Sequence, residues 1–286
     1  MKTAIVKPLF RFISLILILA IAGTVGAQSE FVTPSGMDET ALTAAVDKLI
    51  QENESTTAGA AFSVFRNDQT ILERYVGEAD LENAVPVSEE TVFEWGSATK
   101  MLVWVSALQL WEQGKLDLET DVRTYLPEGF FTKRKNDDPI TYLNLMHHNA
   151  GWEEGLKDLF LSQGTGFNGL ETELKTHEPI QIYETGQYTA YSNWGVALAG
   201  HIIERISGLT FSEYVHQNIF EPLGMTQTAL LPDLADNPWV QSQRSFTQGY
   251  TTTNQLISPN WFQINLYPAG MATGTLRDFE LFGKAL

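Results

Sequence analysis

Cysteine is absent from the 286 residues of this chain. Its absence excludes disulfide bonds, a cysteine nucleophile, thiolate metal sites and the acylation that anchors a lipoprotein. It leaves the compartment open, because an exported protein need not use disulfide bonds. The chain therefore depends on an apolar core, and hydrophobic residues make up 43% of it.

Basic residues are scarce, with 18 lysines and arginines against 35 acidic residues and a formal net charge of −17. A surface of this sign repels a phosphate backbone, so we expect no nucleic-acid partner. Two patterns of other enzyme classes are also missing, the G-x-S-x-G elbow of α/β-hydrolases and the H-E-x-x-H of zinc peptidases. We therefore predict no metal and no cofactor.

Two weaker signals point to other chemistry, and we interpret both as structural. Gly164-x-Gly166-x-x-Gly169 has the letters of a dinucleotide-binding turn, but it follows a stretch with a helical pattern, whereas that turn follows a strand. The adjacent His147 and His148 have no partners at the spacing of a zinc site, so we expect them to pack at the end of a helix.

Long apolar runs are also lacking, and the one extended run lies at the amino terminus. It covers Phe12 to Ala22, about 11 residues, whereas a membrane-spanning helix needs about 20. Basic residues precede the run and small residues follow it as far as Ala27, which is typical of a signal peptide. We predict a signal peptide over residues 1–27, with an uncleaved membrane anchor through residues 9–25 as the alternative. Both place the domain outside the cytoplasm.

The remainder of the chain alternates between patterns of strand and helix. Residues 115 to about 230 are mostly helical segments broken by prolines, with strand patterns before and after them. This order predicts a sheet that is built from both ends of the sequence. The individual elements that we predict are a helix over 38–52, a hairpin of strands 58–65 and 71–77, a helix from Ser97 to Gly114, an amphipathic helix over 195–208 and a strand over 246–257.

The strongest local feature is the segment FEWGSATKML at 93–102. Ser97 and Lys100 are one helical turn apart, so their side chains share a face and can meet. Ser97 lies near the start of a helix, where free N–H groups and the helix dipole favour negative charge. A serine hydroxyl needs a base to become a nucleophile, and a lysine with a lowered pKa can contribute to that. Taken alone, the pattern is equally explained by a helix-capping serine and a surface lysine.

A second feature is YTAYSNWG at 188–195, directly before the amphipathic helix. The phenol of Tyr191 can act as a base if positive charge lowers its pKa from about 10, and Lys100 is the obvious source of that charge. Asn193 can hydrogen-bond an amide group of a substrate. The same Tyr-x-Asn pattern recurs at residues 142–144, where we interpret it as packing within a helix.

Ser97-x-x-Lys100 followed by Tyr191-Ser192-Asn193 resembles the serine β-lactamase and penicillin-binding protein family, in the class C-like branch that includes D,D-peptidases and esterases. The resemblance covers about residues 58–286. Two further segments, LMHHNAGW at 145–152 and PAGMATGTLRDFELFG at 268–283, are similar to family segments and stand in the family's order.

The resemblance implies an α+β fold, an α/β sandwich with a mostly helical subdomain at about 115–230. It also implies that Ser97 forms the acyl-enzyme, that Lys100 and Tyr191 share the proton transfers, and that Asn193 orients the substrate. The Ser97 N–H would supply half of the oxyanion hole. Whether Tyr191 or Lys100 is the base stays open.

The chain departs from the family pattern in three places. Ala150 and Thr185 replace a usual serine and a usual proline, and we expect both replacements to be tolerated. The family's third motif, K-T-G or H-x-G on an inner strand, is not found between Asn193 and Leu286. We therefore expect the C-terminal strands to be missing and the chain to be truncated.

Together these observations predict a signal peptide or anchor over 1–27, a linker and first helix over 28–57, and an incomplete β-lactamase-like domain over 58–286. The expected function is that of an exported serine hydrolase acting through a Ser97 acyl-enzyme. Its partner would be a small-molecule or peptide substrate, namely a β-lactam, a D-Ala-D-Ala-type peptide or a small ester. The alternative is a non-catalytic penicillin-binding or sensor module, or an inactive truncated remnant of the same fold.

Overall fold

The computed structural model describes residues 31–155, 166–258 and 263–286. The predicted signal peptide over 1–27 and the first glycine of the G-x-G-x-x-G pattern lie outside these residues. The chain divides into two units, residues 1–44 and 45–286. In the first unit an isolated β-bridge joins Val32 and Asp38 just before α1 begins. None of the helices in the described ranges is long and apolar enough to cross a membrane.

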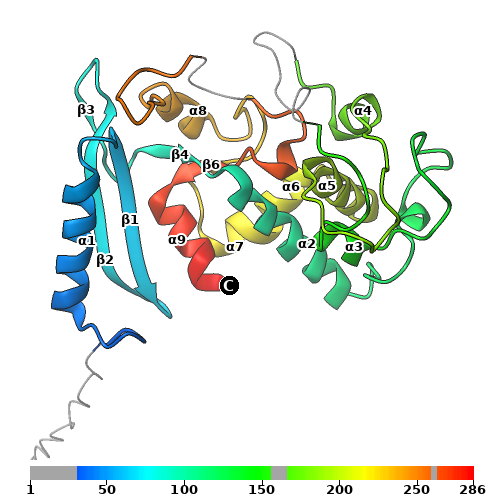
Figure 1. Ribbon diagram of the computed structural model, residues 1–286, viewed down its shortest axis with the longest axis horizontal. Helices are drawn as coiled ribbons and strands as arrows, with labels where there is room; N and C mark the ends of the chain where they lie inside the picture. Colours follow the sequence, from blue (N-terminus) through cyan, green and yellow to red (C-terminus); the bar gives the residue numbers. More distant parts are fainter. Residues whose placement is uncertain (1–30, 156–165, 259–262) are drawn as a thin grey trace, which may run out of the picture. The chain divides into compact units, whose positions relative to one another are not determined.

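The described strands form two small antiparallel sheets, and the helices and helical turns carry most of the remaining regular structure (Figure 1). The strands are β1 (Gly59–Arg66), β2 (Gln69–Asp80), β3 (Val85–Pro86), β4 (Val92–Glu94), β5 (Thr228–Ala229) and β6 (Thr273–Thr275). The helices and helical turns are α1 (Glu39–Asn53), η1 (Gly96–Thr99), α2 (Lys100–Glu112), η2 (Val122–Tyr125), α3 (Tyr142–Met146), α4 (Leu170–Thr176), α5 (Asn193–Ser207), α6 (Phe211–Val215), η3 (His216–Phe220), α7 (Glu221–Leu223), α8 (Pro238–Arg244), η4 (Tyr267–Ala269) and α9 (Leu276–Ala285).

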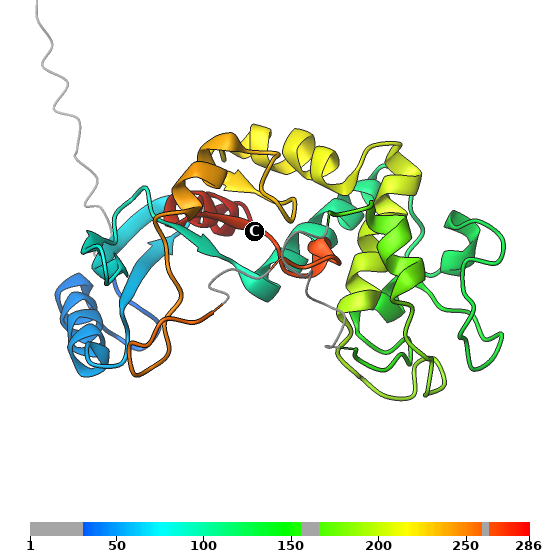
Figure 2. The ribbon, with the colours of Figure 1, turned by 90° about the horizontal axis from the view of Figure 1, so that it is seen from above.

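The first sheet, of order β1-β2-β3, confirms the predicted hairpin. Its pairing runs from Gly59 opposite Gly77 to Arg66 opposite Gln69. Asn67 in the connecting turn has φ 53, a left-handed conformation that asparagine tolerates better than most residues. Helix α9 lies beside β1 in both views (Figures 1 and 2). The hairpin is therefore covered by a helix from the other end of the chain.

The second sheet, of order β4-β6-β5, joins segments that are far apart in sequence. Gly274 of β6 stands opposite Phe93 on one side and Thr228 on the other. A Cβ atom at Gly274 would lie 2.5 Å from the Thr228 hydroxyl, so only glycine fits this strand crossing. This pairing confirms the prediction of a sheet with contributions from both ends of the sequence, and it brings residues 268–275 alongside the segment that follows β4.

Helices α2 and α5 pack against each other and form the centre of the apolar core. Both predicted helices are confirmed, with shifted starts. The segment at Ser97 begins as the 3-10 turn η1, and the α-helix proper starts at Lys100, while α5 starts at Asn193. Gly208 ends α5 in a left-handed conformation with φ 76. Gly200 on α5 is a point of close approach, because a Cβ atom there would lie 2.9 Å from the Pro268 ring.

The strand predicted over 246–257 is wrong. The structure has only an isolated bridge there, between Tyr250 and Leu256, around a turn. The Thr251 hydroxyl accepts hydrogen bonds from the N–H groups of Thr253 and Gln255, at 3.3 and 3.1 Å. The local side chain thus satisfies backbone groups that a sheet partner would otherwise bind, a competition that β-propensity does not register.

Candidate active site

Ser97 is the second residue of the turn η1 and its side chain is exposed. Two hydrogen bonds to the segment after η4 hold this turn in place. The Trp95 N–H donates to the Ala272 carbonyl at 2.8 Å, and the Ala272 N–H donates to the Thr99 hydroxyl at 3.1 Å. The serine therefore stands at the start of a helix, where the first N–H groups have no partner within the helix.

Lys100 is 5% exposed, and its ammonium group lies at the centre of a hydrogen-bond cluster. Nζ donates to Asn193 Oδ1 at 2.7 Å, to the Ala269 carbonyl at 2.6 Å and to Ser97 Oγ at 3.1 Å. The first two acceptors are carbonyl oxygens that can only accept, so they take two of the Nζ protons. The third position on the nitrogen faces the serine, where it holds either a proton or a lone pair.

Burial lowers the pKa of Lys100, and the neighbouring Tyr191 and the negative charge of Glu154 oppose that shift. The cause is the cost of holding an ammonium group away from water, which favours the neutral amine. A lysine of this kind can exchange a proton with a hydroxyl that touches it.

Tyr191 and Asn193 reach Ser97 and Lys100 from either side of a helix-capping serine. The Ser192 hydroxyl accepts from the Gly195 N–H at 3.0 Å, so Tyr191 stays outside α5 while Asn193 begins it. Tyr191 is 47% exposed, and its hydroxyl lies 2.8 Å from Ser97 Oγ. Its ring centroid is 4.8 Å from Lys100 Nζ. The structure thus brings all four residues that the sequence singled out into one cluster.

His148 belongs to this cluster as a support, a role that the sequence did not reveal. Its Nδ1 accepts from the Ser192 N–H at 3.2 Å, and its carbonyl accepts from the Ala190 N–H at 2.7 Å. The imidazole packs against the Tyr191 ring with centroids 4.6 Å apart. Burial, and to a lesser degree the charge of Lys100, lowers the pKa of His148, which favours the neutral ring that can accept this hydrogen bond.

Glu154 is a second residue that the sequence reasoning missed. Its carboxylate accepts from both the main-chain N–H and the side-chain Nδ2 of Asn193, at 2.9 and 2.7 Å. Glu153, its neighbour in sequence, has no such contact with the cluster and instead meets Ile180. No sequence signal separates the two glutamates, because the distinction depends on which of them the loop turns toward α5.

The Tyr142-Leu143-Asn144 pattern packs within a helix, as expected. Tyr142 is fully buried and its hydroxyl donates to the Ala199 carbonyl at 3.1 Å, while Asn144 completes a capping box with Thr141. His147 is the residue that ends this helix, α3. Among the described residues no group of three or more His, Cys, Asp or Glu side chains is placed to hold a metal ion.

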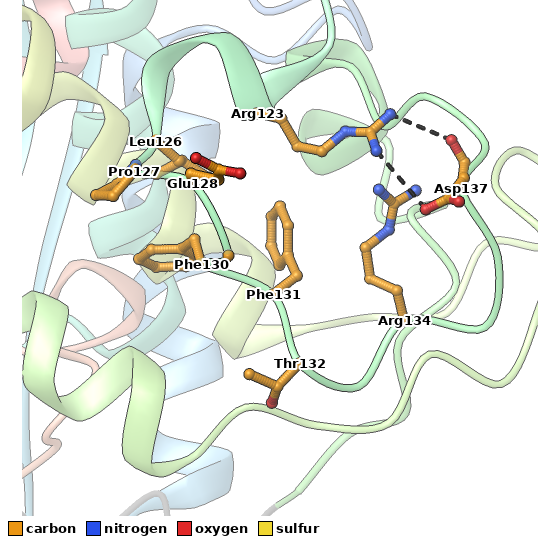
Figure 3. A pocket seen from close by; sticks show the side chains of 10 residues that line it. Arg123, Leu126, Pro127, Glu128, Phe130, Phe131, Thr132, Arg134 and Asp137 are labelled. Carbon is orange, nitrogen blue, oxygen red and sulfur yellow. Dashed lines mark hydrogen bonds and ion pairs between the residues drawn. The ribbon is translucent and has the colours of Figure 1, made fainter.

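A separate pocket is lined by the stretch from Arg123 to Asp137 and holds none of the four clustered residues (Figure 3). Arg123 donates to the Asp137 carbonyl at 3.1 Å across one side of it. Phe131 forms part of its lining, and the centroid of its ring lies 5.8 Å from that of Trp152 and 6.3 Å from that of Trp194. The pocket therefore adjoins the aromatic rings that pack at the start of α5, and its lining includes neither Ser97 nor Lys100.

Comparison with known proteins places these features in context. The profile of the Beta-lactamase family matches residues 37–286. A β-lactamase of Providencia stuartii is 26% identical over 226 residues, which is 75% of this chain and 52% of that protein. The putative penicillin-binding protein PbpX of Bacillus subtilis is 27% identical over 223 residues, which is 78% of this chain and 53% of that protein. The chain thus spans about half the length of these curated relatives.

Solved structures show the same likeness. The octameric penicillin-binding protein homologue from Pyrococcus abyssi has a TM-score of 0.67 and 22% identity, over 87% of this chain and 56% of that one. EstCE1, a hydrolase with promiscuous acyltransferase activity, has a TM-score of 0.70 and 20% identity, over 85% of this chain and 72% of that one. At these identities the likeness establishes a shared fold.

Proposed function

Because the chain belongs to the β-lactamase family, we propose that it is a serine hydrolase that forms an acyl-enzyme on Ser97. One observation carries the proposal: Ser97 Oγ lies 2.8 Å from the Tyr191 hydroxyl and 3.1 Å from Lys100 Nζ. An exposed hydroxyl that contacts two groups able to take its proton is the arrangement that an activated serine nucleophile requires.

In the proposed reaction Ser97 Oγ attacks a carbonyl carbon, and its proton passes to the Tyr191 and Lys100 pair. The carbonyl oxygen becomes negative, and the start of a helix at Ser97 favours that charge. The C–N bond of an amide or lactam, or the C–O bond of an ester, then breaks, and the leaving nitrogen or oxygen takes up the proton. Water hydrolyses the resulting ester and restores the serine.

The proposed substrates are a β-lactam, a D-Ala-D-Ala-type peptide or a small ester. The names of two relatives, a β-lactamase and a putative penicillin-binding protein, support the β-lactam within this range. The rate at which water removes the acyl group separates a penicillin-binding protein, which stays acylated, from a β-lactamase, which turns over. The apolar segment within residues 1–27 supports action outside the cytoplasm, as a secreted or anchored protein.

The test is covalent labelling of the full-length protein with a fluorescent penicillin. We expect label on the wild type and on Ser245→Ala, which removes an exposed hydroxyl that donates to the Ser242 carbonyl at 2.7 Å, and none on Ser97→Ala. Equal labelling of Ser97→Ala would exclude Ser97 as the nucleophile. If the wild type takes no label and gives no burst with p-nitrophenyl acetate, the hydrolase proposal fails and the non-catalytic module replaces it.

A further inference from the structure

Glu154 makes the most specific contact in the cluster that the proposed reaction does not use. Its two carboxylate oxygens divide between two donors on the same residue, Oε2 with the Asn193 N–H and Oε1 with the Asn193 Nδ2. Asn193 is 9% exposed, whereas Glu154 is exposed to solvent. A charged side chain at the surface therefore holds a buried residue by two hydrogen bonds, one to its main chain and one to its side-chain amide.

This contact determines which way the Asn193 amide points. A carboxylate can only accept, so it requires the NH₂ end of the amide, and the carbonyl end is then turned toward Lys100, 2.7 Å away. The reversed amide would place its oxygen against the carboxylate and its NH₂ group against the lysine nitrogen. The contact between the amide oxygen and the carboxylate is repulsive whatever the protonation state of the lysine, and the contact between the NH₂ group and the lysine is repulsive when the lysine is protonated. Glu154 therefore excludes the reversed orientation.

We propose that Glu154 is a positioning residue that fixes the Asn193 amide and thereby aims the third position of Lys100 Nζ at Ser97. The inference rests on the proposed function. It requires that Asn193 and the Ala269 carbonyl together take two protons of the lysine, as their distances of 2.7 and 2.6 Å show. If the asparagine carbonyl turns away, the lysine loses one of these two acceptors and its direction toward the serine.

The charge of Glu154 also acts on Lys100. Among the residues that the structure describes, the ionisable groups that face the lysine are Tyr191, His148 and Glu154. Burial lowers the pKa of Lys100, and the negative charge of Glu154 raises it again in part. Removing that charge therefore shifts the titration of Lys100 to lower pH, whether its neutral or its protonated form is the active one.

The experiment compares Glu154→Gln with Glu153→Gln in the full-length protein, using the second-order rate of acylation by a fluorescent penicillin. Glutamine has an NH₂ group in place of one carboxylate oxygen, and this NH₂ group cannot accept from either N–H donor of Asn193. Glu154→Gln can therefore keep at most one of the two hydrogen bonds. We expect acylation by Glu154→Gln to be about tenfold to a hundredfold slower. Within the described part of the chain, Glu153 forms hydrogen bonds with the main chain of Ile180 and none with the cluster, so Glu153→Gln should stay within about twofold of the wild type.

Two further readouts separate positioning from a general structural role. The limb of the pH–rate profile that reports Lys100 should move to lower pH in Glu154→Gln and stay in place in Glu153→Gln. In a ¹⁵N-labelled sample the Asn193 side-chain amide protons, assigned by their loss in Asn193→Ala, should exchange with solvent faster in Glu154→Gln than in the wild type.

The outcomes distinguish this inference from the proposed function. If the wild type is acylated and Glu154→Gln matches it in rate and pH profile, the positioning role is overturned. If the wild type is not acylated, the hydrolase proposal fails, and amide exchange still decides whether Glu154 fixes Asn193. Unchanged exchange in Glu154→Gln overturns the inference in that case as well.

Discussion

Replacing Tyr191 by phenylalanine removes one oxygen atom from the cluster and leaves the ring in place. That oxygen lies 2.8 Å from Ser97 Oγ, so its loss leaves Lys100, at 3.1 Å, as the remaining group that can take the serine proton. A positioned acid–base group contributes about 10²–10⁴ to a rate, which is about 3–5 kcal/mol of activation free energy. We expect acylation of Tyr191→Phe to be slower by a factor in this range.

The same substitution should have little effect on stability. Tyr191 is 47% exposed, and the hydrogen bond that it loses joins two exposed side chains, so the cost is below about 1 kcal/mol. For a domain of this size that is a shift in melting temperature of less than about 4 °C. The predicted effect is therefore a large loss of rate with an almost unchanged fold.

The assay is stopped-flow acylation by a fluorescent penicillin together with thermal melting, with Tyr188→Phe as the matched control. Tyr188 is 54% exposed and belongs to the same loop, but its hydroxyl has no contact with Ser97. Acylation of Tyr191→Phe within about threefold of Tyr188→Phe would refute the role of the phenol and leave Lys100 as the base. A loss of rate matched by a large drop in melting temperature would mean that the hydroxyl acts through structure.

Four further predictions concern other groups of the site and of the core. Lys100→Met should slow acylation by a factor of about 10²–10⁴. It should change the free energy of unfolding, measured in urea, by less than about 2 kcal/mol, because removing a buried charge stabilises the fold while leaving two carbonyl oxygens without a donor destabilises it. Burial lowers the pKa of Lys100, so at a pH just below its ordinary pKa of 10.5 the unfolded chain binds more protons than the folded chain. In that pH range the melting temperature should therefore rise with pH, and it should rise more in the wild type than in Lys100→Met. Burial raises the pKa of Tyr142 and Tyr267 well above 10.0, so the unfolded chain releases protons first and stability should fall with pH above that value. Ser192→Ala removes the cap of α5 and should cost about 1 kcal/mol in urea unfolding, with Ser245→Ala unchanged.

The fold could be predicted from the sequence where local pattern and family resemblance agreed. The expected β-lactamase and transpeptidase-like fold is confirmed by structural neighbours, and the hairpin and the helices at α2 and α5 were predicted within a few residues. The strand expected over 246–257 failed because the Thr251 hydroxyl closes a local turn. Propensity describes how a residue fits a sheet, and it does not describe what a side chain does for its own backbone.

The candidate site divides along the same line. Ser97, Lys100, Tyr191 and Asn193 could be found because their side-chain chemistry and spacing identify them. The Ala269 carbonyl could not be found in this way, because almost every residue carries a main-chain carbonyl. Its place beside Lys100 depends on the pairing of β6 with β4. Whether a carbonyl becomes part of a site is decided by tertiary structure alone.

The three acceptors around Lys100 show why the cluster depends on distant parts of the chain. Ser97 lies in the 3-10 turn directly before the lysine, Asn193 is brought by the packing of α5 on α2, and Ala269 by the segment that leads into β6. Gly200 allows α5 to approach Pro268, and Gly274 allows β6 to pass Thr228. A side chain at either glycine would move an acceptor by a fraction of an ångström, which weakens a hydrogen bond to a partly desolvated ammonium group. Gly200→Ala should therefore slow acylation through Lys100, although Gly200 lies far from Ser97 in sequence.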